Sequence, residues 1–215
     1  MRIRDRLQIS DRRQQQAARL MQLCLVGILF VGIDRGNPGI IVNSLVALLV
    51  TEVPAILDRD FGLNMDPGLV LWLTTAVFLH AVGTLGPYQN VTGFDHVTHM
   101  LSSSLVAGTG YAFARAVDEH WEDNHFPAKF TFVLILLVVL AFGVLWEVIE
   151  FSIGLAANAL GTRGVLTQYG LHDSMLDLIY NTLGGLIVAI WGTAYLSGFA
   201  EELRAAIASR EEPGK

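Results

Sequence analysis

The sequence predicts an all-α protein, a polytopic integral membrane bundle of about six transmembrane helices with both termini in the cytoplasm. Of its 215 residues, 53% are hydrophobic and 16% are charged, whereas a soluble domain has about 25% charged residues. Apolar runs of roughly 20 residues, the length that spans a bilayer, recur along the chain. Six spans put both termini on the same side of the membrane. Basic residues concentrate in the segments on that side. The positive-inside rule assigns that side to the cytoplasm.

The predicted membrane domain covers residues 17–200. Its six spans are 17–33, 39–57, 68–85, 94–117, 128–151 and 173–197. An Arg-rich amphipathic segment, 1–16, precedes the domain and a charged tail, 201–215, follows it, and we expect both in the cytoplasm. On the opposite side the loops carry only Arg35 and Arg163 as basic residues. These features predict a multi-pass protein of the cytoplasmic membrane, surrounded by the lipid bilayer.

Composition also narrows the class of partner. The formal net charge is −6 at pH 7, and no basic run suggests binding to the phosphate backbone of a nucleic acid. We therefore expect no nucleic-acid partner. The single cysteine, Cys24, lies in the first apolar run, so an intrachain disulfide is excluded and a packing role is expected.

Ionisable side chains collect at the predicted outer ends of the third to sixth spans. Three pairs have members three or four residues apart, which places both members on one helix face. These pairs are Asp95 with His99, Glu147 with Glu150, and Asp173 with Asp177. Asn181 extends the Asp177 face by one turn, and His80 lies near the end of the third span. At a rise of 1.5 Å per residue, all of them fall within roughly 12 Å of membrane depth.

This cluster is the predicted site. Its metal-ligand candidates are Asp95, His99, Glu147, Glu150, Asp173 and Asp177, with Asn181 beside them. Spans four to six have no Lys or Arg at that depth, so protonation, a bound cation or water must compensate the acids. Carboxylate and imidazole ligands without a thiol suit iron, manganese or zinc, with magnesium if the histidines stay outside. Several carboxylates would permit two metal ions.

Three interpretations of the cluster stay open: a metal site, an ion or proton relay, and structural hydrogen bonding. Asp173 by itself also fits a helix N-cap, and His80 by itself fits a hydrogen-bonded packing histidine. For an enzyme, His96 and His80 are the candidate catalytic proton carriers. Arg163, in the loop after the fifth span, is the candidate for holding an anionic substrate group.

The segments that carry these residues resemble known families. They are Phe94-Asp95-His96-Val97-Thr98-His99, Trp146-Glu147-Val148-Ile149-Glu150-Phe151, and Asp173 followed by Asp177 to Gly185. They look like the VanZ-like membrane family and, more closely, the related YjdF-type family of uncharacterised membrane proteins. VanZ-like proteins have an acid and a His opening one span, an acid late in the next, an Arg, and then Asp-x-x-x-Asn-x-x-Gly. Asp95, His99, Glu147 or Glu150, Arg163, Asp177, Asn181 and Gly184 fill those places here.

His96 and Glu150 depart from the simpler VanZ pattern, which favours the YjdF-type family. The resemblance implies a polytopic cell-envelope protein, sometimes linked to glycopeptide-antibiotic tolerance, and implies no settled reaction.

The leading functional hypothesis is metal-assisted chemistry on a lipid or envelope precursor, at a site that opens toward the outer leaflet. The substrate would be lipid-like or anionic. The alternative is non-enzymatic: an ion or proton pathway, or a membrane subunit with a structural metal or polar cluster. The cytoplasmic half of the spans offers only Glu52 as a carboxylate, which disfavours a continuous path across the membrane.

Overall fold

The computed structural model describes residues 10–120, 126–162, 164–166, 170–191, 200–201 and 203–204. Within this part of the chain the structure is helical and contains no strand, which confirms the all-α prediction. The helices are α2 (Asp11–Asp34), α3 (Pro38–Thr51), α4 (Val53–Phe61), α5 (Pro67–Gly83), α6 (Pro87–Asn90), α7 (Phe94–His120), α8 (Ala128–Ala159) and α9 (Leu171–Trp191).

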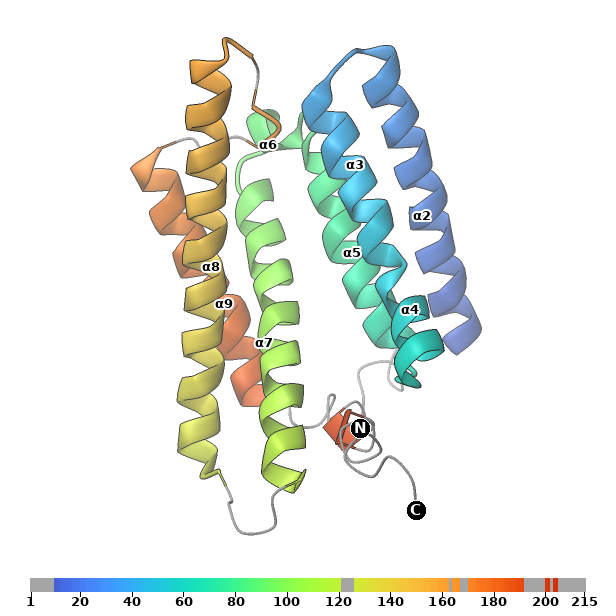
Figure 1. The fold of residues 1–215 in the computed structure, drawn as a ribbon, viewed down its shortest axis with the longest axis vertical. Helices are drawn as coiled ribbons and strands as arrows, with labels where there is room; N and C mark the ends of the chain where they lie inside the picture. The colour runs from blue at the N-terminus through green and yellow to red at the C-terminus, as the bar shows by residue number, and fades with distance from the viewer. Residues whose placement is uncertain are drawn as a thin grey trace.

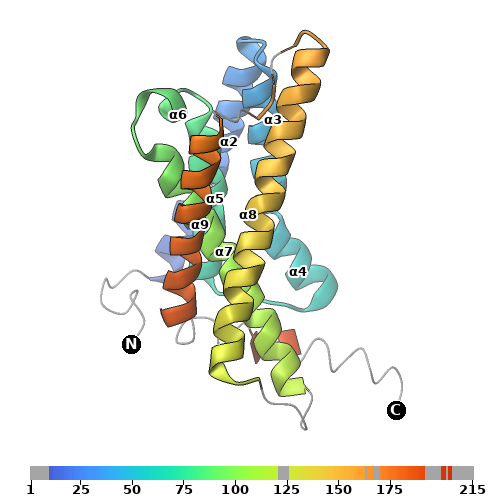
Figure 2. The same cartoon turned by 90° about the vertical axis from the view of Figure 1, so that its left-hand side faces the viewer.

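The long helices form two halves that lie side by side (Figures 1 and 2). One half contains α2, α3 and α5, and the other contains α7, α8 and α9. Packing between α5 and α7 joins the halves. The link between α2 and α3, the short helix α6 and the segment after α8 all lie at the upper end in Figure 1. This end is predicted to lie outside the cell.

In the part of the chain that the structure describes, four helical stretches are long and apolar enough to cross a membrane. They are Asp11–Asp34, Pro38–Phe61, Ala128–Ala159 and Leu171–Ile190. Helix α5 is apolar but has 17 residues, and α7 has 27 residues but is more polar. The multi-pass membrane class is therefore confirmed, while a total of six spans stays a prediction that depends on α5 and α7.

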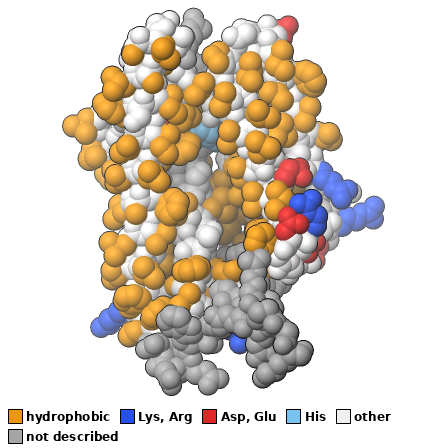
Figure 3. All heavy atoms as spheres, viewed as in Figure 1, with side chains coloured by type: hydrophobic (Ala, Val, Ile, Leu, Met, Phe, Trp, Pro, Cys, Tyr) orange, Lys and Arg blue, Asp and Glu red, His pale blue; other side chains and the backbone are white. Residues whose placement is uncertain are grey.

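The surface of the bundle suits a lipid environment. Large apolar side chains point outward, for example Leu23 at 71% and Phe30 at 66% exposure. Hydrophobic side chains cover most of the face shown in Figure 3, and the charged side chains on it gather mainly beside α4. An apolar patch of this extent indicates contact with a membrane.

Capping residues set the helix starts at both ends of the bundle. The Ser10 side chain accepts a hydrogen bond from the backbone N–H of Arg13, so α2 begins at Asp11. The described part of the predicted amphipathic segment is therefore continuous with the first span. Asn37 and Asp66 cap α3 and α5 in the same way, each followed by a proline at the first helical position, where a missing N–H costs nothing.

The second predicted span is interrupted at Glu52. Helix α3 ends one residue before it and α4 begins one residue after it. Pro54 explains the break, because proline has no N–H to donate to the preceding turn. The span therefore consists of two helices.

Each half has its own apolar core. Leu25, Ile28, Ile40, Ala47 and Ala81 pack together in the α2–α3–α5 half. The other cluster brings Leu69 of α5 together with α7, α8 and α9 through Ala107, Tyr111, Ile135, Val139 and Val188. Helices α7 and α9 approach so closely at Gly184 that a Cβ there would overlap Ser103 Oγ and the Met100 carbonyl oxygen. This close approach fixes the two helices that carry the candidate site.

Candidate metal centre

Two helices bring three of the predicted ligands together. Asp95 and His99 lie one turn apart on α7, and Asp177 faces them from α9. One ligand atom from each of the three residues lies within 4.8 Å of the other two. The Asp177 side chain is almost fully buried, and Asp95 and His99 are partly shielded. We refer to Asp95, His99 and Asp177 as the acid–histidine cluster.

Glycines position both helix starts. Gly93 directly precedes α7 and Gly170 directly precedes α9. Both have positive φ angles, 79° and 108°. Their carbonyl oxygens accept bonds from the N–H groups of Val97 and Ser174 in the first helical turns. Glycine adopts such angles without the steric cost that a Cβ would add. The turns therefore set the residues at which α7 and α9 begin, close before Asp95 and Asp173.

The distances within the cluster are longer than those of direct hydrogen bonds. His99 Nε2 lies 3.5 Å from Asp95 Oδ1 and 3.8 Å from Asp177 Oδ2. Strong N–H···O hydrogen bonds have shorter distances, about 2.7–3.2 Å. Two ligands at metal bonds of about 2.0–2.2 Å adopt separations near those observed.

His96 approaches the cluster from its other side. Its Nδ1 atom lies 3.6 Å from Asp177 Oδ1, and its ring stacks on Tyr180 with centroids 4.4 Å apart and planes 5° from parallel. Both His96 Nδ1 and Asp177 Oδ1 are buried without a hydrogen-bond partner among the described residues. A buried polar atom in that condition costs free energy unless a ligand or water satisfies it.

The remaining predicted ligands border the cluster. Glu147 and Glu150 are buried on α8, at 7% and 8% exposure, but they are not members of the group within 4.8 Å. Asp173 lies in the first turn of α9, which begins two residues earlier, so it is not the N-cap. Asn181 is buried one turn beyond Asp177 and lines a cavity with His99. The structure thus unites three of the six predicted ligands and places the other three around them.

His80 belongs to a different polar network. Its Nε2 lies 3.1 Å from Asn43 Oδ1, and its Nδ1 lies 2.5 Å from the Tyr88 hydroxyl. The Asn43 amide nitrogen donates to the carbonyl oxygens of Gly39 and Val165, both at 2.8 Å. Asn43 Oδ1 therefore accepts from His80 Nε2–H, and the Tyr88 hydroxyl donates to Nδ1. We call Asn43, His80 and Tyr88 the His80 network.

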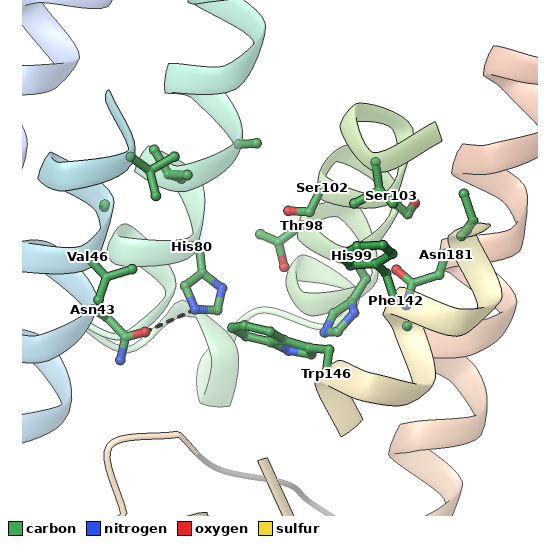
Figure 4. A pocket seen from close by; sticks show the side chains of 17 residues that line it. Asn43, Val46, His80, Thr98, His99, Ser102, Ser103, Phe142, Trp146 and Asn181 are labelled. Carbon is green, nitrogen blue, oxygen red and sulfur yellow. Dashed lines mark hydrogen bonds between the residues drawn. The ribbon is translucent and has the colours of Figure 1, made fainter. Parts of the chain in front are cut away.

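Trp146 stands between the two groups (Figure 4). Its ring meets the edge of the His80 ring at a centroid distance of 5.9 Å, and the His99 ring lies on its other side. Both ring nitrogens of His80 are hydrogen-bonded within its own network, and Trp146 stands between His80 and His99. Its packing role, which the sequence left open, describes its geometry better than proton transfer does.

Tyr88 is held in place by Gly83. A Cβ at Gly83 would overlap the Tyr88 ring, so only glycine allows the ring to lie against α5. Tyr88 belongs to α6, outside the spans, and burial raises the pKa of its hydroxyl. The hydroxyl therefore stays protonated and able to donate to His80.

Two cavities adjoin the cluster. The outer cavity, of about 700 Å³, has mostly polar walls that include Arg35, Gln89, Asp95, Glu150 and Asn158. The inner cavity, of about 310 Å³, has mostly apolar walls, among them Val46, Val77, Val106, Phe142 and Trp146. Asn43 and His80 line both cavities.

Sequence reasoning did not assign three of these residues to the site: Arg35, Asn43 and Tyr88. Arg35 lines the outer cavity, and the available signal in the sequence was that it is one of two basic residues predicted on the outer side. Asn43 and Tyr88 carry no distinctive spacing, because their partners come from other helices. The predicted anion-binding residue, Arg163, lies outside the described residues.

The fold and site define a class: a multi-pass membrane protein with a buried acid–histidine cluster near one end of its bundle. The chain belongs to the family described as "Predicted membrane protein (DUF2238)", which matches residues 17–198. The predicted YjdF-type relationship is confirmed at this level, whereas a relationship to VanZ-like proteins stays a prediction.

A relative from Thermotoga maritima, described as an uncharacterized protein, is 31% identical over 120 residues. The match covers 53% of this chain and 56% of the relative, so the chain spans about half of that protein's length. No solved structure matches the chain.

Proposed function

We propose that the acid–histidine cluster binds one divalent transition metal and uses it for chemistry on a lipid or envelope precursor. Asp95, His99 and Asp177 are the proposed ligands, and iron, manganese and zinc fit their chemistry. In this proposal both termini lie in the cytoplasm, and the site faces outward from the cytoplasmic membrane. Only one ion is proposed, because Glu147 and Glu150 do not join the group within 4.8 Å.

The observation that carries this proposal is the environment of Asp177. Its carboxyl group is almost fully buried between two histidines, yet one oxygen has no hydrogen-bond partner among the described residues. No Lys or Arg appears among the described residues within 4.0 Å of it. A bound cation would compensate the charge and occupy the remaining acceptor position.

A metal at this position would polarise a substrate oxygen or activate water. The chain's own residues supply the other requirements of catalysis. His96 lies beside Asp177 and is the candidate for taking up or releasing a proton. Its stacking on Tyr180 fixes the ring orientation. Glu150 and Asp95 line the outer cavity, where an incoming polar group would meet the site.

The alternative is a non-enzymatic cluster that carries protons or serves only as structure. The geometry that favours it is the approach of His96 and His99 to the same carboxyl group, at 3.6 and 3.8 Å. In this alternative a proton shared among the three residues replaces the metal.

Elemental analysis and thermal unfolding of the purified protein distinguish the two. A ligand that binds only the folded state stabilises it by RT ln(1 + [L]/Kd), about 2.7 kcal/mol at a hundredfold excess over Kd. We expect chelation to lower the melting temperature and added zinc, manganese or iron to restore it.

Asp177→Asn should abolish both the bound metal and the chelator effect, since an amide is a poorer ligand. Glu52→Gln is the matched control: it removes the same charge from an exposed position that borders neither cavity. A metal-free wild type that melts alike with and without chelator would support the proton-sharing alternative.

A further inference from the structure

The two cavities meet at the candidate metal centre and differ in polarity. His99 lines the inner, apolar cavity, whereas Asp95 lines the outer, polar cavity. Because these two residues are neighbours in the cluster, the cluster lies at the boundary between the cavities. An amphiphile whose polar and apolar parts occupied the two cavities would have its junction beside the cluster.

The inner cavity is accessible from the side of the bundle. Val46 on α3 and Phe142 on α8 line it, and 51% and 57% of these residues are exposed on the apolar surface. Figure 3 shows a groove between the two halves, with a histidine side chain visible inside it. Figure 4 shows the same space from close by, with α3 and α5 on one side and α7, α8 and α9 on the other. A lipid chain in the bilayer therefore has a lateral route into this cavity.

We propose that the paired cavities bind one phosphate-bearing lipid, with a single hydrocarbon chain in the inner cavity and the head group in the outer cavity. The inner volume of about 310 Å³ lies near the lower end of the range for small-molecule sites, about 300–1,000 Å³. It suits one chain rather than a whole diacyl lipid. Its mostly apolar wall favours hydrocarbon.

Charge argues for a phosphate in the outer cavity. Among the described residues that line it, Arg35 is the one basic side chain, opposite the acids Asp95 and Glu150. A divalent ion at the cluster would offset the two negative charges of its ligands Asp95 and Asp177. Arg35 and the ion would then bind an anionic head group together. The head-group assignment thus rests on the proposed function, whereas the chain assignment does not.

Photocrosslinking tests the chain site directly. The probe is phosphatidylglycerol with a diazirine in one acyl chain, mixed into phosphatidylcholine vesicles that contain the full chain. Peptide mapping should find the label on the cavity-lining parts of α3 and α7. Ser102→Phe and Val46→Trp fill the cavity from two helices, and each should lower the labelling about tenfold, equivalent to about 1.4 kcal/mol.

Matched controls place the same side chains on neighbouring surfaces. Thr109→Phe on α7 and Leu45→Trp on α3 change exposed residues that do not line the inner cavity, and labelling should stay at the wild-type level. Each variant is compared by size-exclusion chromatography, and if one cavity variant fails to fold, the other still decides. Wild-type labelling in a folded cavity variant overturns the chain site.

A second probe tests the head group. Diacylglycerol with the same diazirine chain lacks the phosphate and should label metal-loaded protein less than phosphatidylglycerol does. Chelation or Arg35→Gln should reduce this preference without removing the chain label. Equal labelling by the two probes in metal-loaded protein overturns the head-group assignment.

The same samples are analysed for metal, so the two proposals can fail separately. Absence of metal together with loss of labelling in the cavity variants rejects the proposed function and keeps the chain site. Bound metal together with unchanged labelling in those variants rejects the chain site and keeps the proposed metal site.

Discussion

The His80 network and the acid–histidine cluster lie on opposite sides of Trp146 and solve the problem of buried polar groups differently. In the His80 network, an amide, a ring and a hydroxyl are joined by bonds of 3.1 and 2.5 Å. In the cluster, His99 Nε2 lies 3.5 and 3.8 Å from the carboxylate oxygens of Asp95 and Asp177. Asp177 Oδ1 lacks a hydrogen-bond partner among the described residues, as does Nδ1 of the adjacent His96.

The difference teaches that the role of a buried histidine depends on its hydrogen-bonding partners rather than on its depth in the bundle. Neutral donors and acceptors can satisfy an imidazole completely, so the His80 network needs nothing from outside the protein. Carboxylates around an imidazole offer acceptors and negative charge, which a cation can satisfy. We therefore propose a structural role for the His80 network and ligand binding for the cluster.

The largest expected effect on the cluster's scaffold comes from Gly184→Ala. The added Cβ would overlap Ser103 Oγ and the Met100 carbonyl oxygen, and thus force α7 and α9 apart. Overpacking of this kind costs about 1–3 kcal/mol. Because these helices carry the three proposed ligands, metal affinity should fall together with the melting temperature.

Gly27→Ala is the control for helix propensity. A Cβ at Gly27 meets nothing within 4 Å, so the substitution should be neutral or stabilise α2 by up to about 1 kcal/mol. Thermal unfolding and metal titration of both variants check the comparison. Wild-type stability in Gly184→Ala would contradict the close approach of α7 and α9.

A smaller effect is expected from Tyr88→Phe, which keeps the ring and removes the hydroxyl of the His80 network. The change removes the hydroxyl that donates to His80 Nδ1, and one hydrogen bond contributes about 0.5–1.5 kcal/mol. The melting temperature should fall by that equivalent while metal content stays at the wild-type level. Loss of metal in Tyr88→Phe would show that the two groups act as one site.

The same tyrosine predicts a pH dependence. Burial raises the pKa of the Tyr88 hydroxyl above its ordinary value of about 10, so the folded state retains this proton at pH values where the unfolded state loses it. Stability from this group is present below about pH 10 and is lost as pH rises toward the folded-state pKa. Unfolding measured above pH 10 should therefore show a smaller loss for Tyr88→Phe than for the wild type.

Topology labelling should leave stability unchanged and test whether both polar groups lie toward the outside. On a Cys24→Ser background, single cysteines replace Gln89 on α6 or Asp58 on α4, both exposed positions. An impermeant thiol reagent applied to intact cells should label Gln89→Cys and leave Asp58→Cys unlabelled. The opposite pattern would invert the predicted orientation and place the cluster on the cytoplasmic side.

Much of this arrangement follows from sequence patterns. Apolar runs predict the membrane helices because a bilayer requires a fixed length of apolar chain. The four-residue spacing of Asp95 and His99 predicts their shared face because the helix repeat is local. Pro54 shows why span boundaries were less accurate: one residue divides a continuous apolar run into two helices.

Contacts between segments that are distant in the sequence could not be predicted from such patterns. Asn43 receives its role from His80 on α5 and from Val165 after α8, and no spacing in α3 reveals either partner. Glu147 and Glu150 are both buried. Their distance from the other carboxylates depends on how α8 packs against α7 and α9, which no local spacing reveals.

The most direct test is the metal content of His99→Ala compared with that of His80→Ala, each purified without chelator. His80→Ala leaves the Asn43 and Tyr88 partners unsatisfied, at a cost of about 1–3 kcal/mol for a buried group, and should retain its metal despite lower stability. His99→Ala removes a proposed ligand and should lose most of its metal. Retention of metal by His99→Ala together with its loss from His80→Ala would contradict the assignment of the two histidines.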